Sequence, residues 1–178
     1  MKRSIFLNAS ALALVSPTFA FAFGVSTIVA VNCNVPELDE EAEDILSGKL
    51  RDLKVNVVDP SAMDTTYHER ARLEVAQLLG GVSVDYSAIA WVTQTYHARR
   101  LLVAEARMTS TALPYGQFTV YNVRASCSYR AFDTSSKQIV SAGTMFSIGR
   151  AEEERAAQED ALQNAMDQLA THAARRLL

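Results

Sequence analysis

Histidine is the side chain that proteins use most often to bind metals and to transfer protons near neutral pH, and this chain of 178 residues contains three. His68, His97 and His172 lie far apart in the sequence. None of them has the H-E-x-x-H or H-x-H spacing that brings two ring nitrogens to one side of a metal ion. The histidines therefore predict neither a metal site nor a catalytic residue.

A small basic cluster surrounds the second histidine, because Arg99 and Arg100 follow His97 closely. Such a cluster could dock an acidic partner protein or a phosphate-bearing glycan. The alternative is a solvated surface without a partner. We name His97, Arg99 and Arg100 as a candidate partner-binding cluster.

The chain contains two cysteines, Cys33 and Cys127. Their spacing excludes the C-x-x-C pattern of redox and zinc sites. Each cysteine lies on a predicted strand and faces the predicted interior. Two alternatives remain open, a disulfide between Cys33 and Cys127 or two buried free thiols.

The sequence contains no motif for a bound cofactor. No G-x-S-x-G elbow, phosphate-binding loop or G-x-G-x-x-G motif occurs, and Gly80-Gly81 is better interpreted as a helix stop. A formal net charge of −3 argues against nucleic acid as a partner. We therefore expect a protein without cofactors that is not an enzyme; the competing class is a small envelope hydrolase or ligand-binding protein.

The N-terminal residues have the pattern of a secretory signal peptide. Lys2 and Arg3 precede an apolar run from Ile5 to Val15, and Ala20-Phe21-Ala22 fits the small-x-small cleavage pattern. We predict cleavage after Ala22, which makes residues 1–22 a signal peptide and residues 23–178 a single exported domain. The alternative is an uncleaved anchor helix, since apolar residues continue to Val31, but Pro17, Gly24 and Ser26 interrupt that run. The expected compartment is the periplasm, and association with the outer membrane is compatible with this prediction.

The stretch from Gln117 to Gly149 predicts an antiparallel hairpin. Alternation of apolar and polar residues predicts one dry face on each strand, and the polar residues Asp133 to Lys137 predict the turn between them. The first strand is long enough to extend ~50 Å at ~3.3 Å per residue, so the hairpin must bend or its tip must project. The residues assigned to the dry face are Tyr121, Val123, Ala125, Cys127, Tyr129 and Ala131 on the first strand, and Val140, Ala142, Phe146 and Ile148 on the second.

The remaining elements complete an α/β (α+β) fold of order β-α-β-α-α-β-β-β-α. It consists of a mixed sheet of about five strands with helices packed on it. The C-terminal helix is expected to cover the dry face of the hairpin with an apolar stripe at helical spacing, formed by Leu162, Ala165, Met166, Leu169, Ala173 and Leu177. The other predicted elements are a strand over Val25–Cys33 buried on both faces, a helix beginning at Pro36, a strand over Lys54–Asp59, helices after Asp59 and Asp85, a strand over Arg100–Thr109, a mobile segment over Thr111–Gly116, and the helix over Ala151–Leu178.

Three stretches carry a resemblance to a known family: VVDPSAMD (57–64), ARRLLVAEARM (98–108) and YRAFDTSSKQIVSAGT (129–144). Together with the element order, they resemble the domain shared by CsgG, the N-terminal domain of TolB, LpoB, and the flagellar proteins FlgO and FlgT. The turn departs from the family pattern, since Ser135 and Ser136 replace the usual glycine.

The resemblance implies an envelope protein that acts by binding. It would be a non-enzymatic interaction or assembly module of a secretion, flagellar or cell-wall-synthase machine, with other envelope proteins as partners and possible self-association into a ring. A projecting hairpin would also offer free backbone groups for strand addition by a partner. The alternative within the family is a subunit of an oligomeric outer-membrane pore, in which the Phe118–Ile148 hairpin enters the membrane.

Overall fold

The computed structural model describes residues 25–58, 87, 90 and 95–178. They form a mixed five-stranded sheet of order β2-β1-β3-β4-β5, in which β1 is parallel to β2 and β3, while β3, β4 and β5 are antiparallel. The α+β fold predicted from the sequence is therefore confirmed. Its elements are β1 (Ser26–Cys33), η1 (Pro36–Leu38), α1 (Asp39–Asp52), β2 (Asn56–Val57), β3 (Arg100–Tyr115), β4 (Phe118–Asp133), β5 (Gln138–Ala151) and α4 (Glu154–Leu177).

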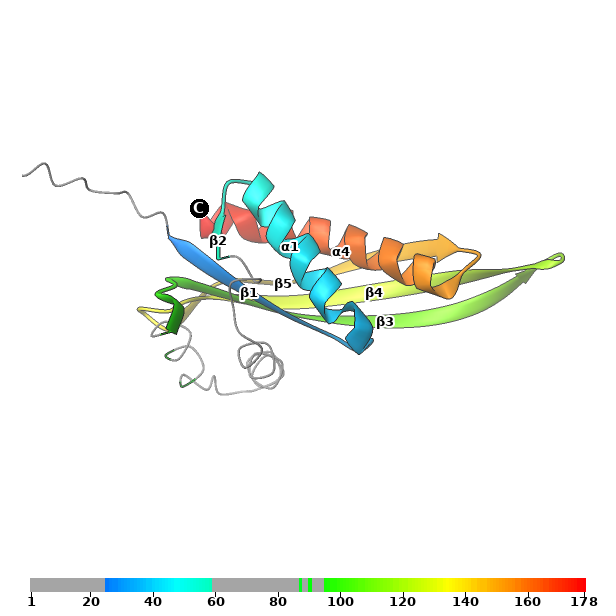
Figure 1. The fold of residues 1–178 in the computed structure, drawn as a ribbon, viewed down its shortest axis with the longest axis horizontal. Helices are drawn as coiled ribbons and strands as arrows, with labels where there is room; N and C mark the ends of the chain where they lie inside the picture. Colours follow the sequence, from blue (N-terminus) through cyan, green and yellow to red (C-terminus); the bar gives the residue numbers. More distant parts are fainter. Residues whose placement is uncertain (1–24, 59–86, 88–89, 91–94) are drawn as a thin grey trace, which may run out of the picture.

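Both described long helices, α1 and α4, lie side by side on one face of the sheet (Figure 1). Ion pairs join them near both ends of α1, from Arg155 to Glu41 at 2.9 Å and from Lys49 to Asp167 at 3.5 Å. The prediction that α4 covers the dry face of β4 is confirmed, because the apolar residues of both elements belong to one core. The buried stripe of α4 includes all six predicted residues, Leu162, Ala165, Met166, Leu169, Ala173 and Leu177.

We call the opposite side of the sheet, away from α1 and α4, the far face. Near β1 its side chains are buried, as Ile28, Leu101 and Phe132 show. This confirms that β1 is buried on both faces. Farther along β3 and β4 the far face becomes exposed, beginning at Arg107 and Arg124. The exposed half of the far face is where a partner could bind.

The strand β3 is longer than predicted. It continues to Tyr115, so the segment 111–116 that was predicted to be mobile is mostly paired strand, with Pro114 opposite Thr119. The proline is tolerated because β1 ends at Cys33, opposite Ala106, and β3 is an edge strand from there on. Pro114 does not end the strand, because at this position β3 pairs with β4 on one side and has no second neighbouring strand that would need the missing amide.

The predicted dry face of β5 is confirmed at Val140, which packs against the core, and is wrong at Ala142, Phe146 and Ile148; a β-bulge explains the error. Phe132 pairs with Ile139, whereas Ala131 pairs with Ser141, so Val140 is an extra residue in β5. Because side chains alternate with period 2, one extra residue transfers every later residue to the other face. Ala142, Phe146 and Ile148 consequently lie exposed on the far face, and the residues of opposite parity turn toward α4.

The second strand is shorter than predicted, since β2 spans only Asn56–Val57. Lys54, with a φ of 70°, forms the tight connection from α1, and the amide of Val55 donates to the carbonyl of Leu50 at 3.0 Å. The signal peptide and the two predicted helices after Asp59 and Asp85 lie outside the described residues, apart from isolated helical positions. Within the described residues, no helix is both long and apolar enough to cross a membrane.

Candidate functional site

The hairpin of β3 and β4 projects beyond the rest of the sheet (Figure 1). β5 pairs with β4 only as far as Tyr121, so the residues Leu113–Val120, which we call the arm, form a two-stranded ribbon. The arm turns at Gly116, whose φ of 63° suits glycine. The strand length predicted that the β4–β5 hairpin bends or that its tip at Asp133–Lys137 projects. The part that projects is instead the opposite end of β4, where it turns into β3, while the β4–β5 turn bonds back to the domain from Thr134 to Arg99.

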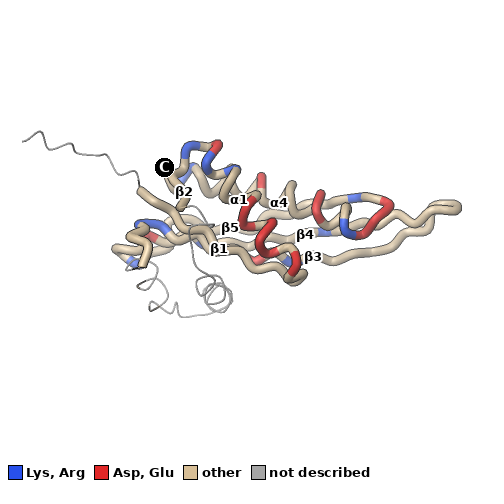
Figure 2. The backbone as a smooth tube through the Cα atoms, viewed as in Figure 1, with Lys and Arg blue, Asp and Glu red and all other residues tan. Residues whose placement is uncertain are grey.

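The arm is uncharged, and it carries large apolar side chains at its tip. No Asp, Glu, Lys or Arg occurs from Met108 to Val123, which leaves this end of the molecule without charge in Figure 2. Tyr115 and Phe118 are direct cross-strand partners next to the turn, and Leu113 lies on the same face. All three side chains are exposed. The arm tip is therefore an apolar surface that is exposed to water in the isolated molecule.

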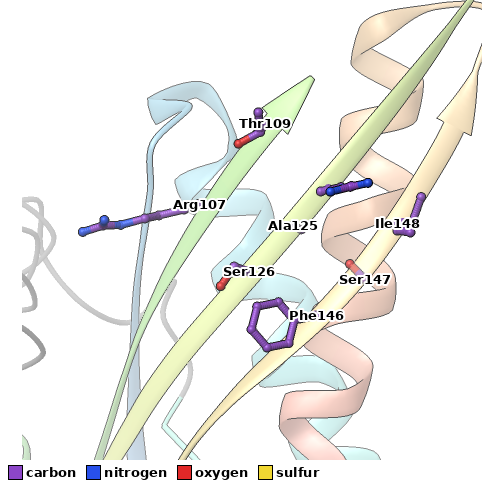
Figure 3. Close-up of a pocket in the computed structure, with 8 residues that line it drawn as sticks. Arg107, Thr109, Ala125, Ser126, Phe146, Ser147 and Ile148 are labelled. Atoms are coloured by element: carbon purple, nitrogen blue, oxygen red, sulfur yellow. The ribbon is translucent and has the colours of Figure 1, made fainter. Parts of the chain in front are cut away.

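A groove of about 480 Å³ lies on the far face at the base of the arm (Figure 3). The register of β3, β4 and β5 places the lining side chains next to one another. Ser126 on β4 is opposite both Arg107 on β3 and Phe146 on β5, and Arg124 is opposite Ile148. Phe146 and Ile148 are exposed in it as a consequence of the bulge in β5. The lining residues are Arg107, Thr109, Arg124, Ala125, Ser126, Phe146, Ser147 and Ile148.

The chemistry of the groove is that of a binding surface. It combines apolar area with two guanidinium groups, of which that of Arg107 pairs with Glu105 at 3.1 Å. Its lining includes no carboxylate, histidine or cysteine, so it holds no acid–base pair. Among the described residues, no group of three or more His, Cys, Asp or Glu side chains could hold a metal ion.

A second polar arrangement lies under α4. The hydroxyl of Tyr129, which is buried, shares a hydrogen bond with the Ser141 hydroxyl at 2.8 Å and a second one with Nδ1 of His172. Burial raises the pKa of Tyr129, although its bond with Ser141 opposes the shift. A shallow hollow of about 470 Å³ adjoins His172 and is also lined by Lys49, Asp167 and Arg175. Sequence reasoning missed this arrangement, since Tyr129 and His172 are distant in the chain.

The two cysteines lie in the same core, on different strands. Cys33 on β1 is opposite Ala106 on β3, and Ala106 is opposite Cys127 on β4. One complete strand therefore separates them, which places their Cα atoms about 9.5 Å apart, beyond the ~7 Å limit for a disulfide. Both are free and buried, so the structure favours the alternative of two buried thiols.

Burial makes both thiols weak acids. It raises the pKa of Cys127 to about 12. Burial raises the pKa of Cys33 even further, with the nearby Asp39 carboxylate contributing. Thiolate chemistry at either residue is therefore disfavoured, and we assign them a packing role.

The candidate basic cluster is divided in the structure. Arg100 is partly buried and forms an ion pair with Asp133, whereas His97 and Arg99 are exposed. His97 has a φ of 52°, and its carbonyl accepts a hydrogen bond from the Ser26 hydroxyl at 3.4 Å. The structure brings the three residues to one end of β3 and leaves only His97 and Arg99 accessible. Their role in binding a partner remains a prediction.

Asp133 organises the turn that joins β4 to β5. Its Oδ1 accepts hydrogen bonds from the Ser135 hydroxyl and from the amides of Ser136 and Ser135, at 2.9 Å and 3.0 Å for the two amides. These bonds, with the Ser135 hydroxyl contributing most, and the nearby Arg100 guanidinium hold the pKa of Asp133 well below its usual range. The turn can therefore use serines where the resembled family has glycine.

Taken together, the geometry defines a class: an α+β protein with a mixed five-stranded sheet, helices on one face, and an exposed apolar arm and groove on the other. Neither a family model nor a curated protein sequence matches this chain. Among solved structures, the hypothetical protein CT253 from Chlamydia trachomatis is similar, with a TM-score of 0.56 at 13% identity over 86% of this chain and 97% of that chain. That similarity is one of fold.

Two further solved structures are more distant. The PelC dodecamer from Paraburkholderia phytofirmans has a TM-score of 0.47 at 14% identity over 82% of this chain and 86% of that chain. Lipoprotein GNA1162 from Neisseria meningitidis has a TM-score of 0.44 at 14% identity over 83% of this chain and 99% of that chain. These two likenesses carry no argument about function. The resemblance to CsgG and its relatives implied a fold of this kind.

Proposed function

We propose that this chain is an exported, non-enzymatic envelope protein that serves as an interaction or assembly module of an outer-membrane-associated machine, in the manner of the CsgG and TolB N-terminal group. One observation carries the proposal. Of the seven large hydrophobic side chains that are exposed in the described residues, five lie at the arm tip or in the groove, namely Leu113, Tyr115, Phe118, Phe146 and Ile148.

Such a concentration of exposed apolar groups is typical of a protein-binding surface. Aromatic side chains and arginine are the residue types enriched at protein interfaces, and Tyr115, Phe118, Phe146 and Arg124 supply both. The Asn34 side chain bonds to both backbone groups of Met108, and beyond Met108 the edge of β3 presents backbone groups without a second neighbouring strand among the described residues. Side-chain anchors and an open strand edge support binding as the function of this part of the molecule.

The signal-peptide pattern of residues 1–22 and the family resemblance support a periplasmic location. The expected partners are other envelope proteins, including further copies of this chain in a ring. The side chains of the groove and the arm are apolar, hydroxyl, amide or guanidinium groups, which supports binding in preference to hydrolysis.

The proposal is tested by purifying the mature protein with its partners from the native envelope and measuring the mass of the complex. The wild-type chain is compared with the arm variant Tyr115→Ser/Phe118→Ser and with a control variant, Gln163→Ser, on the exposed side of α4. We expect cleavage after Ala22 and a complex that the arm variant loses and the control retains. A cytoplasmic, uncleaved protein, or equal recovery of partners with the arm variant, would contradict the proposal.

A further inference from the structure

The far face carries two apolar surfaces that a single molecule cannot bring into contact. At the arm tip, Tyr115 and Phe118 are 76% and 63% exposed; in the groove, Phe146 and Ile148 are 70% and 51% exposed. The tip and the groove share the strand β4, on which Phe118 precedes Arg124 by six residues. At ~3.4 Å per residue this separates them by about 20 Å along a continuous ladder, so the arm cannot fold back onto its own groove.

The arm tip has the properties of an inserting element. Tyr115 and Phe118 lie directly opposite each other at the turn and point to the same side of the ribbon. The stretch from Met108 to Val123 lacks charge, so burying the tip would not strip water from any ionised side chain. Aromatic side chains contribute large contact areas at a low cost in conformational entropy.

The groove has the size and the side chains needed to receive an aromatic arm tip. Its volume of about 480 Å³ falls within the range of clefts that enclose small ligands, ~300–1,000 Å³, which is sufficient for aromatic side chains. Phe146 and Ile148 offer apolar contact, and the guanidinium groups of Arg107 and Arg124 offer the cation that an aromatic ring attracts. Among the described residues, no acidic partner of Arg124 competes with such a ring.

We propose that the arm tip of one molecule inserts into the far-face groove of a second copy of this chain. This inference deepens the proposed function by naming the partner of the same surface. The contact is heterologous, because the tip and the groove are different surfaces, and each molecule keeps one free tip or one free groove after pairing. Repetition of the contact therefore produces a ring if the rotation closes and a filament if it does not.

The first test is the concentration dependence of the mass of the purified mature protein, measured by sedimentation. We expect the wild-type chain to associate, and we expect Tyr115→Ser/Phe118→Ser and Phe146→Ser/Ile148→Ser each to weaken association by about 10-fold or more. All four side chains are exposed, so the variants should retain the circular dichroism spectrum of the wild type. A wild-type chain that stays monomeric up to several hundred micromolar, or a variant that associates normally, would overturn the inference.

The second test mixes the two double variants. The tip variant keeps an intact groove and the groove variant keeps an intact tip, so a head-to-tail contact predicts that the mixture forms heterodimers and nothing larger. When a mild oxidant is added to accept the two electrons, a chain with Phe118→Cys should likewise form a disulfide with a chain carrying Ile148→Cys. The native cysteines are buried, so they should not compete for this disulfide. Association of either double variant alone, or cross-links between two chains that both carry Phe118→Cys in preference to the mixed pair, would contradict tip-in-groove docking.

The same variants separate this inference from its competitors. If the tip variant loses binding to phosphatidylcholine vesicles while the mass of the wild type never changes, the tip contacts lipid and the inference is wrong. If the tip recovers a different envelope protein and no second copy, the proposed function survives and this inference fails.

Discussion

Gly149 on β5 lies directly against the backbone of Ala157 on α4. A methyl group placed on Gly149 would overlap the Ala157 carbonyl oxygen and would come within 2.5 Å of the Ala161 amide nitrogen. The alanines of α4 and the glycine of β5 thus bring the helix into backbone contact with the strand, and the Ser147 hydroxyl donates to the Ala161 carbonyl beside them. This contact fixes the helix at the end of the sheet from which the arm projects.

Replacing Gly149 with alanine should therefore displace the start of α4. Because the obstructing atoms belong to backbone, we expect Gly149→Ala to lower the free energy of unfolding by about 2–4 kcal/mol, as severe overpacking does. Urea denaturation followed by circular dichroism measures the change. Gly48→Ala is the matched control, since a methyl group there meets nothing within 4 Å. It should be neutral or stabilise α1 by up to about 1 kcal/mol. Equal effects of the two variants would refute the close contact.

The hydroxyl of Tyr129 should contribute to stability through Ser141 and His172. Tyr129→Phe leaves the buried Ser141 hydroxyl without this bond, whereas the exposed His172 ring can bond to water instead, and we expect a loss of about 1–2 kcal/mol of unfolding free energy. Tyr115→Phe, at the exposed arm tip, should change it by less than about 0.5 kcal/mol. A Tyr129→Phe/Ser141→Ala double-mutant cycle should be non-additive, because the two side chains share one bond. Additive losses would show that the network does not form.

The Asp133 turn predicts a specific pH dependence of stability. The folded-state pKa of Asp133 is lowered, so its contribution is complete above the unfolded-state pKa of about 3.9 and is lost as the pH falls toward the folded value. Asp133→Asn should therefore lower the unfolding free energy at pH 7 by about 1–2 kcal/mol, and the difference from wild type should shrink below about pH 4. Asp167→Asn, in a surface ion pair with Lys49, should cost less than about 1 kcal/mol. A difference for Asp133→Asn that grows with acid would contradict the assignment.

The cysteines should behave as protected thiols. In the folded protein we expect Cys33 and Cys127 to react with a thiol reagent far more slowly than a free cysteine does, because burial raises the pKa of both. Unfolding without a reductant should then release two reactive thiols per chain. Finding none after unfolding would show a disulfide, and would require β1, β3 and β4 to pair differently.

Much of the fold could be predicted from local patterns. The alternation from Tyr121 to Ala131 correctly predicted which face of β4 is buried, and the helical spacing of Leu162, Met166 and Leu169 correctly predicted the covering helix. These predictions were confirmed because each depended on the period of a single element and on burial. Asp133 likewise marked the turn, since its side chain binds the turn amides.

The candidate site was harder to predict, because it depends on register between strands. The extra residue Val140 reverses the faces of β5, and no local signal separates a bulge from regular alternation. Phe146 and Ile148 were therefore assigned to the core, although they line the groove. The missing charge from Met108 to Val123 was visible in the sequence and could have indicated the arm. Pro114 instead led to the prediction of a mobile segment over residues 111–116, because proline occurs on edge strands as well as in loops.

Site-specific photo-crosslinking in intact cells tests the central claim most directly. A photoreactive residue placed at Phe118 is compared with one placed at Gln163, on the exposed side of α4. If the molecule works through its arm, the probe at residue 118 should cross-link the mature, exported chain to an envelope protein or to a second copy, and the probe at residue 163 should not. No cross-link from residue 118, or the same products from both positions, would contradict the account.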